Sequence, residues 1–489
     1  MPYWTKWVSA LPVNARRLQR RQESQVILNC HFDIIKQKGQ QTMGIKVKVV
    51  KTAFATIFGG MVVAGCGYNS TRDGISSQDA SVSAMTISEM KEAALSSLAE
   101  GTQRIVNASG GSVAELTIAP TLQRIVSETL CRYADTNDTG IGWAILMSAE
   151  DGAVLALADC GGAADEPRPF ALTRMFTPGH LLSTLTVAAA IDLGIATPDS
   201  ELFTDASEAF YYQYKLPGDG GHIWESHLSV SKALAYSSNV VLCKLGILVG
   251  HDREYGILSK FGIGMRSGIG FPGESAGRLL PPERCSRMQL TRIPIGQGVE
   301  ITVVQIARAY ATLANHGLRV DPYVVKKVSN AEGETLYEHE ASTNMVQAVS
   351  RKAADCTCSI LEGAVKADDL KGMNGVNDED PPDITKALVP PRATGRRAAV
   401  EGVRVAGKTS TVQRMKPNSY EYDFDKYIAS FAGLFPADDP KYVLVVCYET
   451  KRIEGVPYIH QGGGRPAMAF AEIVRELSLE HNHLPAKGK

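Results

Sequence analysis

The sequence predicts an α/β (α+β) domain built around one central antiparallel sheet. Two pairs of strand signals, near residues 141–157 and 427–448, enclose a long middle segment with helical spacing. Strand pairs that flank a helical middle are typical of a sheet packed against helices. The chain has 489 residues, of which 44% are hydrophobic, so it has enough apolar side chains for a large core and enough length for more than one domain.

The first strand pair has the pattern of a buried hairpin. Residues 141–147 form an apolar run that reads as a buried strand. Asp151-Gly152 is a tight-turn signal, and the apolar run 153–157 follows it as the hairpin partner. We therefore expect the domain to open with two antiparallel strands.

The middle segment contains a helix that follows Pro178. Leu181, Leu185, Ala188 and Ile191 recur at spacings of three and four residues, which predicts one apolar helical face. Proline is favoured near helix starts, so the helix is expected to begin soon after Pro178.

The second strand pair and a final helix close the domain. Residues 427–435 and 442–448 read as two strands on either side of the turn 436–440, which contains two prolines and two aspartates. A helix is expected from Ala467 to about Leu479. Both strands are then available to complete the central sheet.

Composition excludes several classes of function. The 51 basic and 52 acidic side chains give a net charge of -1, so no basic surface for nucleic acid is indicated. The nine cysteines contain no CxxC, and no Cys/His set has zinc-ligand spacing, so we predict no metal and no cofactor. Most cysteines are interpreted as buried apolar residues, although a few pairs could form disulfides in an oxidising compartment.

The N-terminal region has the pattern of an export signal. Residues 1–51 hold ten Lys/Arg and two acids, and the apolar run 52–66 follows them. A run of about 15 residues is shorter than the roughly 20 that span a membrane, which favours a signal-peptide core. The positive-inside rule places the remaining chain outside the cytoplasm. Met43 begins a signal-like segment, so translation starting there is a further hypothesis.

The end of the apolar run resembles a bacterial lipobox. Val63-Ala64-Gly65-Cys66 has small residues before a cysteine, and Cys66 is the candidate for lipidation. The alternative is an uncleaved anchor helix with a chance cysteine. Either interpretation attaches the protein to a membrane.

The segment before the main domain is short. The composition of residues 67–85 indicates a polar tether, and Thr86-x-x-Glu89 predicts a capping box that opens a helix to about Val106.

Within the main domain, the acidic and Pro-Pro-containing insertion 365–393 is interpreted as a mobile loop that covers a cleft or presents a partner surface, or alternatively as a solvated loop. The predicted division is 1–66 for the basic region and signal peptide or anchor, 67–114 for the tether and short helix, 115–480 for the main domain and 481–489 for the tail.

Seven short motifs occur in the same order along this chain as in a known protein family. They lie at 116–123, 261–264, 268–274, 277–281, 296–298, 302–310 and 406–413. Together they resemble the transpeptidase domain of penicillin-binding proteins of the division and elongation type. The resemblance implies the penicillin-binding protein transpeptidase or serine β-lactamase-like fold, with helices on both sides of the sheet and an all-helical subregion.

The resemblance also implies three catalytic elements around one cleft: a Ser-x-x-Lys at a helix start, a Ser-x-Asn on a loop and a Lys-Thr-Gly on the edge strand. Ser237-Ser238-Asn239 matches the second element, although an isolated tripeptide of this kind would be interpreted as a helix cap. The third is altered to Lys408-Thr409-Ser410.

The first element is missing. In the phrase Phe176-Thr-Pro-Gly-His-Leu-Leu-Ser183, His180 stands at the nucleophile position and Ser183 at the lysine position. A serine needs a nearby base to become a nucleophile, so no route to an acyl-enzyme is evident. His180 could act as a base or nucleophile, or it could fill a disused cleft.

Two functions of different class follow. The first is a non-catalytic, penicillin-binding-protein-like envelope protein linked to peptidoglycan synthesis or cell division, facing the periplasm or exterior. It would hold peptidoglycan stem peptide, a β-lactam, or other cell-wall synthesis or division proteins. The alternative is an active D,D-transpeptidase or carboxypeptidase that penicillin acylates through a non-standard nucleophile, which the retained Ser237, Asn239, Lys408 and Thr409 favour.

Overall fold

The structure is a computed structural model that describes residues 89, 104–106, 113–134, 140–207, 211–219, 223, 225–271, 273–340, 345–365, 393–415, 422–452 and 460–480. The predicted leader with Cys66, the tether 67–85, all of the insertion 365–393 except its two end residues, and the tail 481–489 lie outside the described residues. Among the described helices, none combines the length and the apolar character that crossing a membrane requires.

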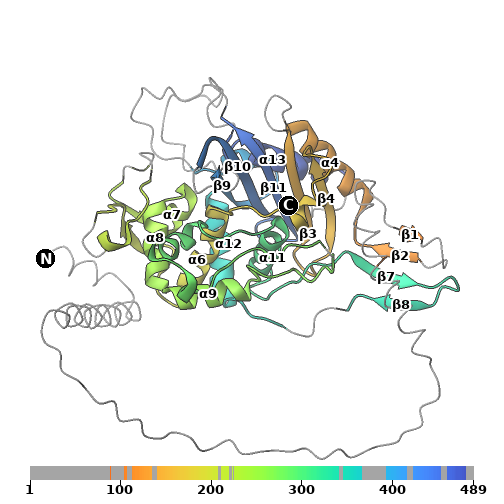
Figure 1. Cartoon of the computed structure of the whole chain (residues 1–489), viewed down its shortest axis with the longest axis horizontal. Coiled ribbons are helices and arrows are strands. Elements are labelled where there is room, and N and C mark those ends of the chain that lie inside the picture. The colour runs from red at the N-terminus through yellow and green to blue at the C-terminus, as the bar shows by residue number, and fades with distance from the viewer. Residues whose placement is uncertain are drawn as a thin grey trace, which may run out of the picture.

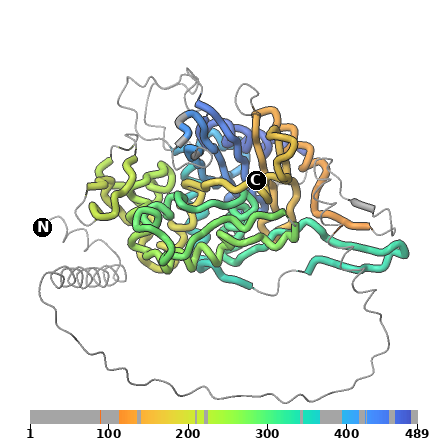
Figure 2. Tube along the Cα trace, viewed as in Figure 1, coloured from red at the N-terminus to blue at the C-terminus, as the bar shows by residue number. Residues whose placement is uncertain are grey.

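A five-stranded antiparallel sheet forms the centre of the domain, in the order β4-β3-β11-β10-β9 (Figure 1). Its strands are β3 (Ile141–Ser148), β4 (Val154–Cys160), β9 (Ala406–Met415), β10 (Tyr422–Phe435) and β11 (Tyr442–Lys451). Both predicted strand pairs are therefore confirmed, and β11 pairs directly with β3. This pairing brings the two ends of the domain together, as the adjacent orange and blue segments show in Figure 2.

Helices cover both faces of this sheet, because its central strands are apolar on both sides. Along β3, Trp143, Ile145 and Met147 face one core, and Ala144 and Leu146 face the other. The period of two along a strand sends alternate side chains to opposite faces, so a continuous apolar run indicates burial on both. The predicted fold class is confirmed.

The two helical layers differ in size. On one face lie α4 (Pro120–Tyr133) and α13 (Arg465–Leu479), and on the other lie α6 (His180–Asp192), α11 (Val303–Ala314) and α12 (Arg351–Gly363). The helix expected after Pro178 is α6, and its side chains are buried on every face because neighbouring elements surround it.

An all-helical subregion lies beside the sheet, at the left of Figure 1. It contains α7 (Val230–Tyr236), α8 (Asn239–Val249), α9 (His251–Lys260) and α10 (Arg287–Arg292). The remaining short elements are α5 (Phe170–Thr173), β5 (Glu201–Phe203), β6 (His227–Ser229), η2 (Tyr212–Tyr214), η3 (Pro282–Arg284), η4 (Ile293–Ile295) and η6 (Arg396–Ala398).

A second sheet stands apart from the central one and corrects one expectation. Its order is β1-β2-β7-β8, with β1 (Arg104–Val106), β2 (Val113–Leu116), β7 (Val325–Ser329) and β8 (Thr335–Glu338). The helix expected to reach about Val106 is wrong at its end, because Arg104–Val106 pairs as a strand with Val113–Glu115. Backbone pairing with a strand distant in sequence outweighs a local helical pattern. Strand β2 also crosses the predicted boundary at 114/115.

Candidate functional site

The start of α6 is shaped by a glycine at its N-cap. Gly179 has φ 55°, and a Cβ placed there would collide with Ser410 Oγ and lie 2.6 Å from Val412 Cγ2. Only glycine adopts such a conformation without strain. The close approach of the edge strand β9 to the helix start therefore depends on Gly179.

His180 is the first residue of α6, and Ser183 lies one turn further. The His180 Nδ1 and Ser183 Oγ atoms are 3.1 Å apart, which is hydrogen-bonding distance. The Ser183 side chain has an exposed fraction of 0%, whereas His180 is half-buried. Ser183 therefore interacts with His180 and has no surface that a substrate could reach.

The turn Ser237-Ser238-Asn239 joins α7 to α8, and its two serines have different roles. Ser238 is the N-cap of α8, and its Oγ accepts a hydrogen bond of 3.2 Å from the Val241 amide, so the helix-cap interpretation applies to this residue. Ser237 has left-handed backbone angles, φ 60° and ψ 45°, and its Oγ accepts a hydrogen bond from Lys408 Nζ. The left-handed residue thus turns its hydroxyl to the edge strand.

Lys408 carries its amine into a buried position on β9. Its exposed fraction is 0%, and besides Ser237 its Nζ donates a 3.0 Å hydrogen bond to the Thr409 carbonyl. Burial disfavours the charged form and lowers the pKa of Lys408 to about 7. The neutral form of the amine is therefore far more accessible at neutral pH than it is for an exposed lysine.

Thr409 and Ser410 continue the strand beyond Lys408. Thr409 Oγ1 donates a 2.6 Å hydrogen bond to Thr394 Oγ1. The Ser410 hydroxyl is buried, and within the part of the chain that the structure describes it has no hydrogen-bond partner. Ser410 thus fills the space between β9 and Gly179 without gaining a polar contact.

Asp219 holds the turn in place, and the sequence pattern did not single it out. Its Oδ2 accepts a 2.8 Å hydrogen bond from Ser238 Oγ, and its Oδ1 accepts one of 3.0 Å from the Val240 amide. The neighbouring Gly218 carbonyl accepts from Asn239 Nδ2 at 2.9 Å. Pro217-Gly218-Asp219 is recognisable as a turn signal, but only the tertiary fold brings it to a turn about 20 residues away.

A buried carboxylate orients the segment that leads into α6. Glu449 on β11 accepts hydrogen bonds from Arg174, at 2.8 Å, and from Arg414 on β9. Arg174 also lies over the Trp143 ring at 5.2 Å. Charge-assisted bonds to a buried carboxylate are stronger than neutral ones. This cluster, also missed from sequence, connects the approach to His180 with β9.

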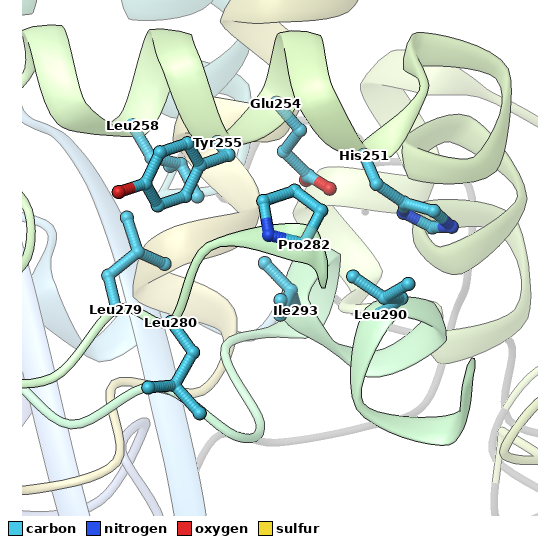
Figure 3. Close-up of a pocket in the computed structure, with 9 residues that line it drawn as sticks. All are labelled: His251, Glu254, Tyr255, Leu258, Leu279, Leu280, Pro282, Leu290 and Ile293. Atoms are coloured by element: carbon cyan, nitrogen blue, oxygen red, sulfur yellow. The ribbon is translucent and has the colours of Figure 1, made fainter. Parts of the chain in front are cut away.

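A small cavity lies elsewhere, under α9 (Figure 3). His251, Glu254, Tyr255 and Leu258 line it from the helix, and the lining is completed by Leu279, Leu280, Pro282, Leu290 and Ile293. None of the predicted site residues lines it. In the described parts of the chain, no group of three or more His, Cys, Asp or Glu side chains is placed to hold a metal ion.

The domain that contains this site is similar in sequence to a known protein family. Residues 142–475 match the family described as "Penicillin binding protein transpeptidase domain". The chain is 31% identical over 385 residues to "Penicillin-binding protein PbpB" of Mycolicibacterium smegmatis, over 76% of this chain and 55% of that protein. It is 26% identical over 391 residues to "Peptidoglycan D,D-transpeptidase FtsI" of Escherichia coli, over 76% and 58%. The chain thus spans about half the length of these relatives.

Solved structures agree with the sequence comparison. Penicillin binding protein 3 from Mycobacterium tuberculosis superposes with a TM-score of 0.62 at 28% identity, covering 77% of this chain and 81% of that one. The same protein in complex with ampicillin gives a TM-score of 0.63 at 27% identity, with 77% and 80% covered.

Proposed function

Because the chain belongs to the penicillin-binding protein transpeptidase family, we propose that it is an envelope protein of peptidoglycan synthesis or cell division that acts by binding, without forming an acyl-enzyme at the start of α6. One observation carries this proposal: His180 and the fully buried Ser183 contact each other at the positions where the family resemblance requires a serine and a lysine.

The replacement of the motif's serine and lysine by His180 and Ser183 removes the groups that acyl transfer requires. Acyl transfer by an alcohol requires a hydroxyl with a base beside it. Removing a nucleophile from a serine hydrolase lowers the rate on the order of 10⁶-fold. An acyl-imidazole formed on His180 would hydrolyse readily, and no lysine follows one turn later. The start of α6 is therefore unsuited to holding a stable acyl group.

The opposite side of the site supports binding. Ser237 and Thr394 are partly exposed, so a ligand can reach their hydroxyls. Behind them the buried Lys408 and Thr409 connect the two through hydrogen bonds, and Asp219 supports the turn that carries Ser237. The similar structure of penicillin binding protein 3 from Mycobacterium tuberculosis has been solved with ampicillin and with aztreonam. We propose that the equivalent region here holds peptidoglycan stem peptide or a β-lactam non-covalently, and that other cell-wall synthesis or division proteins are further partners.

The proposed location follows from the N-terminus together with the family. Residues 1–66 would export and anchor the chain, with Cys66 as the candidate lipidation site, so that the domain faces the periplasm or exterior. Mass spectrometry of the membrane fraction would find the lipidated Cys66 as the new N-terminus. An intact leader in mature protein would contradict lipidation.

The first experiment separates binding from acylation. The full chain is incubated with a fluorescent penicillin, denatured and run on a gel, after cooperative melting has confirmed that it is folded. We expect no covalent band. In parallel, a stem peptide ending in D-Ala-D-Ala should raise the melting temperature of the wild type, and Lys408→Met should abolish that rise. A band that survives denaturation in the wild type would refute the non-catalytic function.

One observation favours a second candidate, turnover through Ser237. Its hydroxyl contacts a buried amine whose pKa of about 7 allows a large neutral fraction at physiological pH. A neutral Lys408 could accept the Ser237 proton while Oγ attacks the peptide carbonyl, then return the proton to the departing amine of D-alanine. Serine and lysine would then act as nucleophile and general base.

Mapping the labelled residue tests this second candidate. If a covalent band forms, Ser237→Ala and Lys408→Met should each abolish it, while His180→Ala retains it. Ser231→Ala is the matched control, because Ser231 lies on α7 with its hydroxyl bonded to the Pro198 carbonyl. A label that persists in Ser237→Ala would exclude Ser237 as nucleophile.

A further inference from the structure

Helix α4 and strand β4 lie in contact and run in the same direction. The Ala119 amide donates to the Leu155 carbonyl at 3.0 Å, and Gln123 exchanges two hydrogen bonds of 2.8 Å with the backbone of Leu157. A helix advances about 1.5 Å per residue and a strand about 3.3 Å. From Gln123 to Cys131, and from Leu157 to Cys160, the two elements therefore advance by similar lengths, about 12 Å and 10 Å.

A second contact places the end of α4 over the same strand pair. The Leu130 carbonyl accepts a 2.9 Å hydrogen bond from Tyr448 Oη. A Cβ added to Gly142 would lie 3.2 Å from Leu130 Cδ1, and Gly142 is the direct cross-strand partner of Cys160. Cys160, Gly142 and Tyr448 lie in register on neighbouring strands, so the Cys160 side chain faces the end of α4 as the Tyr448 side chain does. The residue after Leu130 is Cys131, and its thiol lies close enough to the Cys160 thiol for the two to interact.

We propose that Cys131 and Cys160 form a disulfide once the domain is outside the cytoplasm. Both positions are accessible to an oxidant, since Cys131 is exposed and Cys160 is partly exposed. A small disulfide or a protein thiol–disulfide oxidant would take two electrons. Its S–S bond is reduced to two thiols while the two protein thiols lose their protons and join. The inference depends on export of the domain and is independent of what the cleft binds.

The reactivity of the pair fits enzymatic or slow oxidation. Although Cys131 is exposed as a residue, partial desolvation of its thiol, together with the Cys160 thiol, raises the pKa of Cys131 to about 12. Little thiolate is then present at neutral pH, and the thiolate is the form that attacks a disulfide. We therefore expect the bond to form slowly with glutathione alone and faster with an oxidoreductase of the thioredoxin type.

The bond would join α4 to an edge of the central sheet, because β4 is an outer strand. It closes a loop of about 30 residues that includes all of β3, and a loop of this size restricts the unfolded chain substantially. For a domain of this length, we expect the melting temperature to rise by about 5 °C on oxidation.

The test uses the full chain, incubated with oxidised glutathione and a disulfide oxidoreductase, then alkylated and digested. We expect a linked peptide containing Cys131 and Cys160, lighter by two hydrogens than the reduced pair, with both thiols protected from alkylation until reductant is added. Reduction should lower the melting temperature of the wild type and leave that of Cys131→Ser/Cys160→Ser unchanged.

The matched control is Cys285→Ser/Cys356→Ser, which removes two other partly buried thiols and should keep the full shift. Alkylation of both Cys131 and Cys160 after oxidation would overturn the proposal. Because that readout uses the wild type, it holds even if the double variant fails to fold.

Discussion

Gly179 and Ser410 illustrate how single residues set the shape of the site. The glycine allows β9 to approach the start of α6, and the serine side chain fills the space between them. A glycine at position 410, as in the family motif, would leave that space open. The buried Ser410 hydroxyl has no hydrogen-bond partner among the described residues, and this costs stability, since a buried donor without an acceptor loses its hydration.

Gly179→Ala should destabilise the domain by about 2–4 kcal/mol, because it combines a positive φ with a collision against Ser410 and Val412. Urea unfolding measures the change. Gly256→Ala is the control: Gly256 lies within α9 with nothing within 4 Å of an added Cβ, so we expect a gain of about 0.5–1 kcal/mol. Equal effects at the two positions would contradict this account.

At the scale of elements, the site depends on how the α7–α8 turn is supported. Ser238 caps α8, and Ser237 accepts a hydrogen bond from Lys408, so the same tripeptide stabilises the helix and places a hydroxyl beside β9. Asp219 bonds to the turn from a loop. At the same scale, one ring of α13, that of Phe470, packs against the Phe431 and Phe435 rings of β10 and so holds the helix on the sheet.

Asp219→Ala should cost about 1–3 kcal/mol, since it leaves the buried Ser238 hydroxyl and the Val240 amide without their acceptor. It should also weaken any ligand binding that requires Ser237. Asp439→Ala serves as the control, because its contact with Lys441 is at the surface and should change stability by less than about 0.5 kcal/mol. Differential scanning calorimetry of both variants would distinguish the two cases.

Phe470→Ala should destabilise the domain by about 3–5 kcal/mol. The Phe470 ring lies 4.7 Å from that of Phe431 and 5.8 Å from that of Phe435, all fully buried. Leu479→Ala, at the end of the same helix and 69% exposed, should have little effect. Chemical denaturation compares the two, and a small loss for Phe470→Ala would mean that α13 is loosely packed.

At the scale of the whole molecule, Glu254 connects the helical subregion to α6. It is buried on α9, beside the cavity of Figure 3, and accepts a 2.7 Å hydrogen bond from Thr186 Oγ1 on α6. Burial raises the pKa of Glu254 to about 7. The folded domain therefore binds this proton up to higher pH than the unfolded chain does.

This gives a pH dependence with a defined sign. The contribution of Glu254 to stability is fully present below the unfolded pKa of 4.5 and is lost as pH rises toward the folded value of about 7. Glu254→Gln removes the titration. The free energy of unfolding of the wild type, relative to Glu254→Gln, should fall by roughly 3 kcal/mol between pH 4.5 and pH 8. A difference that does not change with pH would show that Glu254 has an ordinary pKa.

By itself, the sequence determined the central elements of this protein. The strands at 141–147, 153–157, 427–435 and 442–448 and the helix after Pro178 were predictable, because buried apolar runs and proline signals act locally. The order of family motifs likewise predicted the fold. The sequence also gives directly the residues that stand at the motif positions 180, 183 and 408–410. The strand at Arg104–Val106 was not predictable, since its partner β2 decides its conformation.

Only the tertiary structure decided how the site residues meet. The contacts between Lys408 and Ser237 and between Asp219 and Ser238 each join distant parts of the chain, and the approach of Cys131 to Cys160 closes a loop around β3. The lowered pKa of Lys408 and the raised pKa of Glu254 are consequences of burial. Burial and distant contacts arise from packing of the whole chain, so no local sequence pattern encodes them.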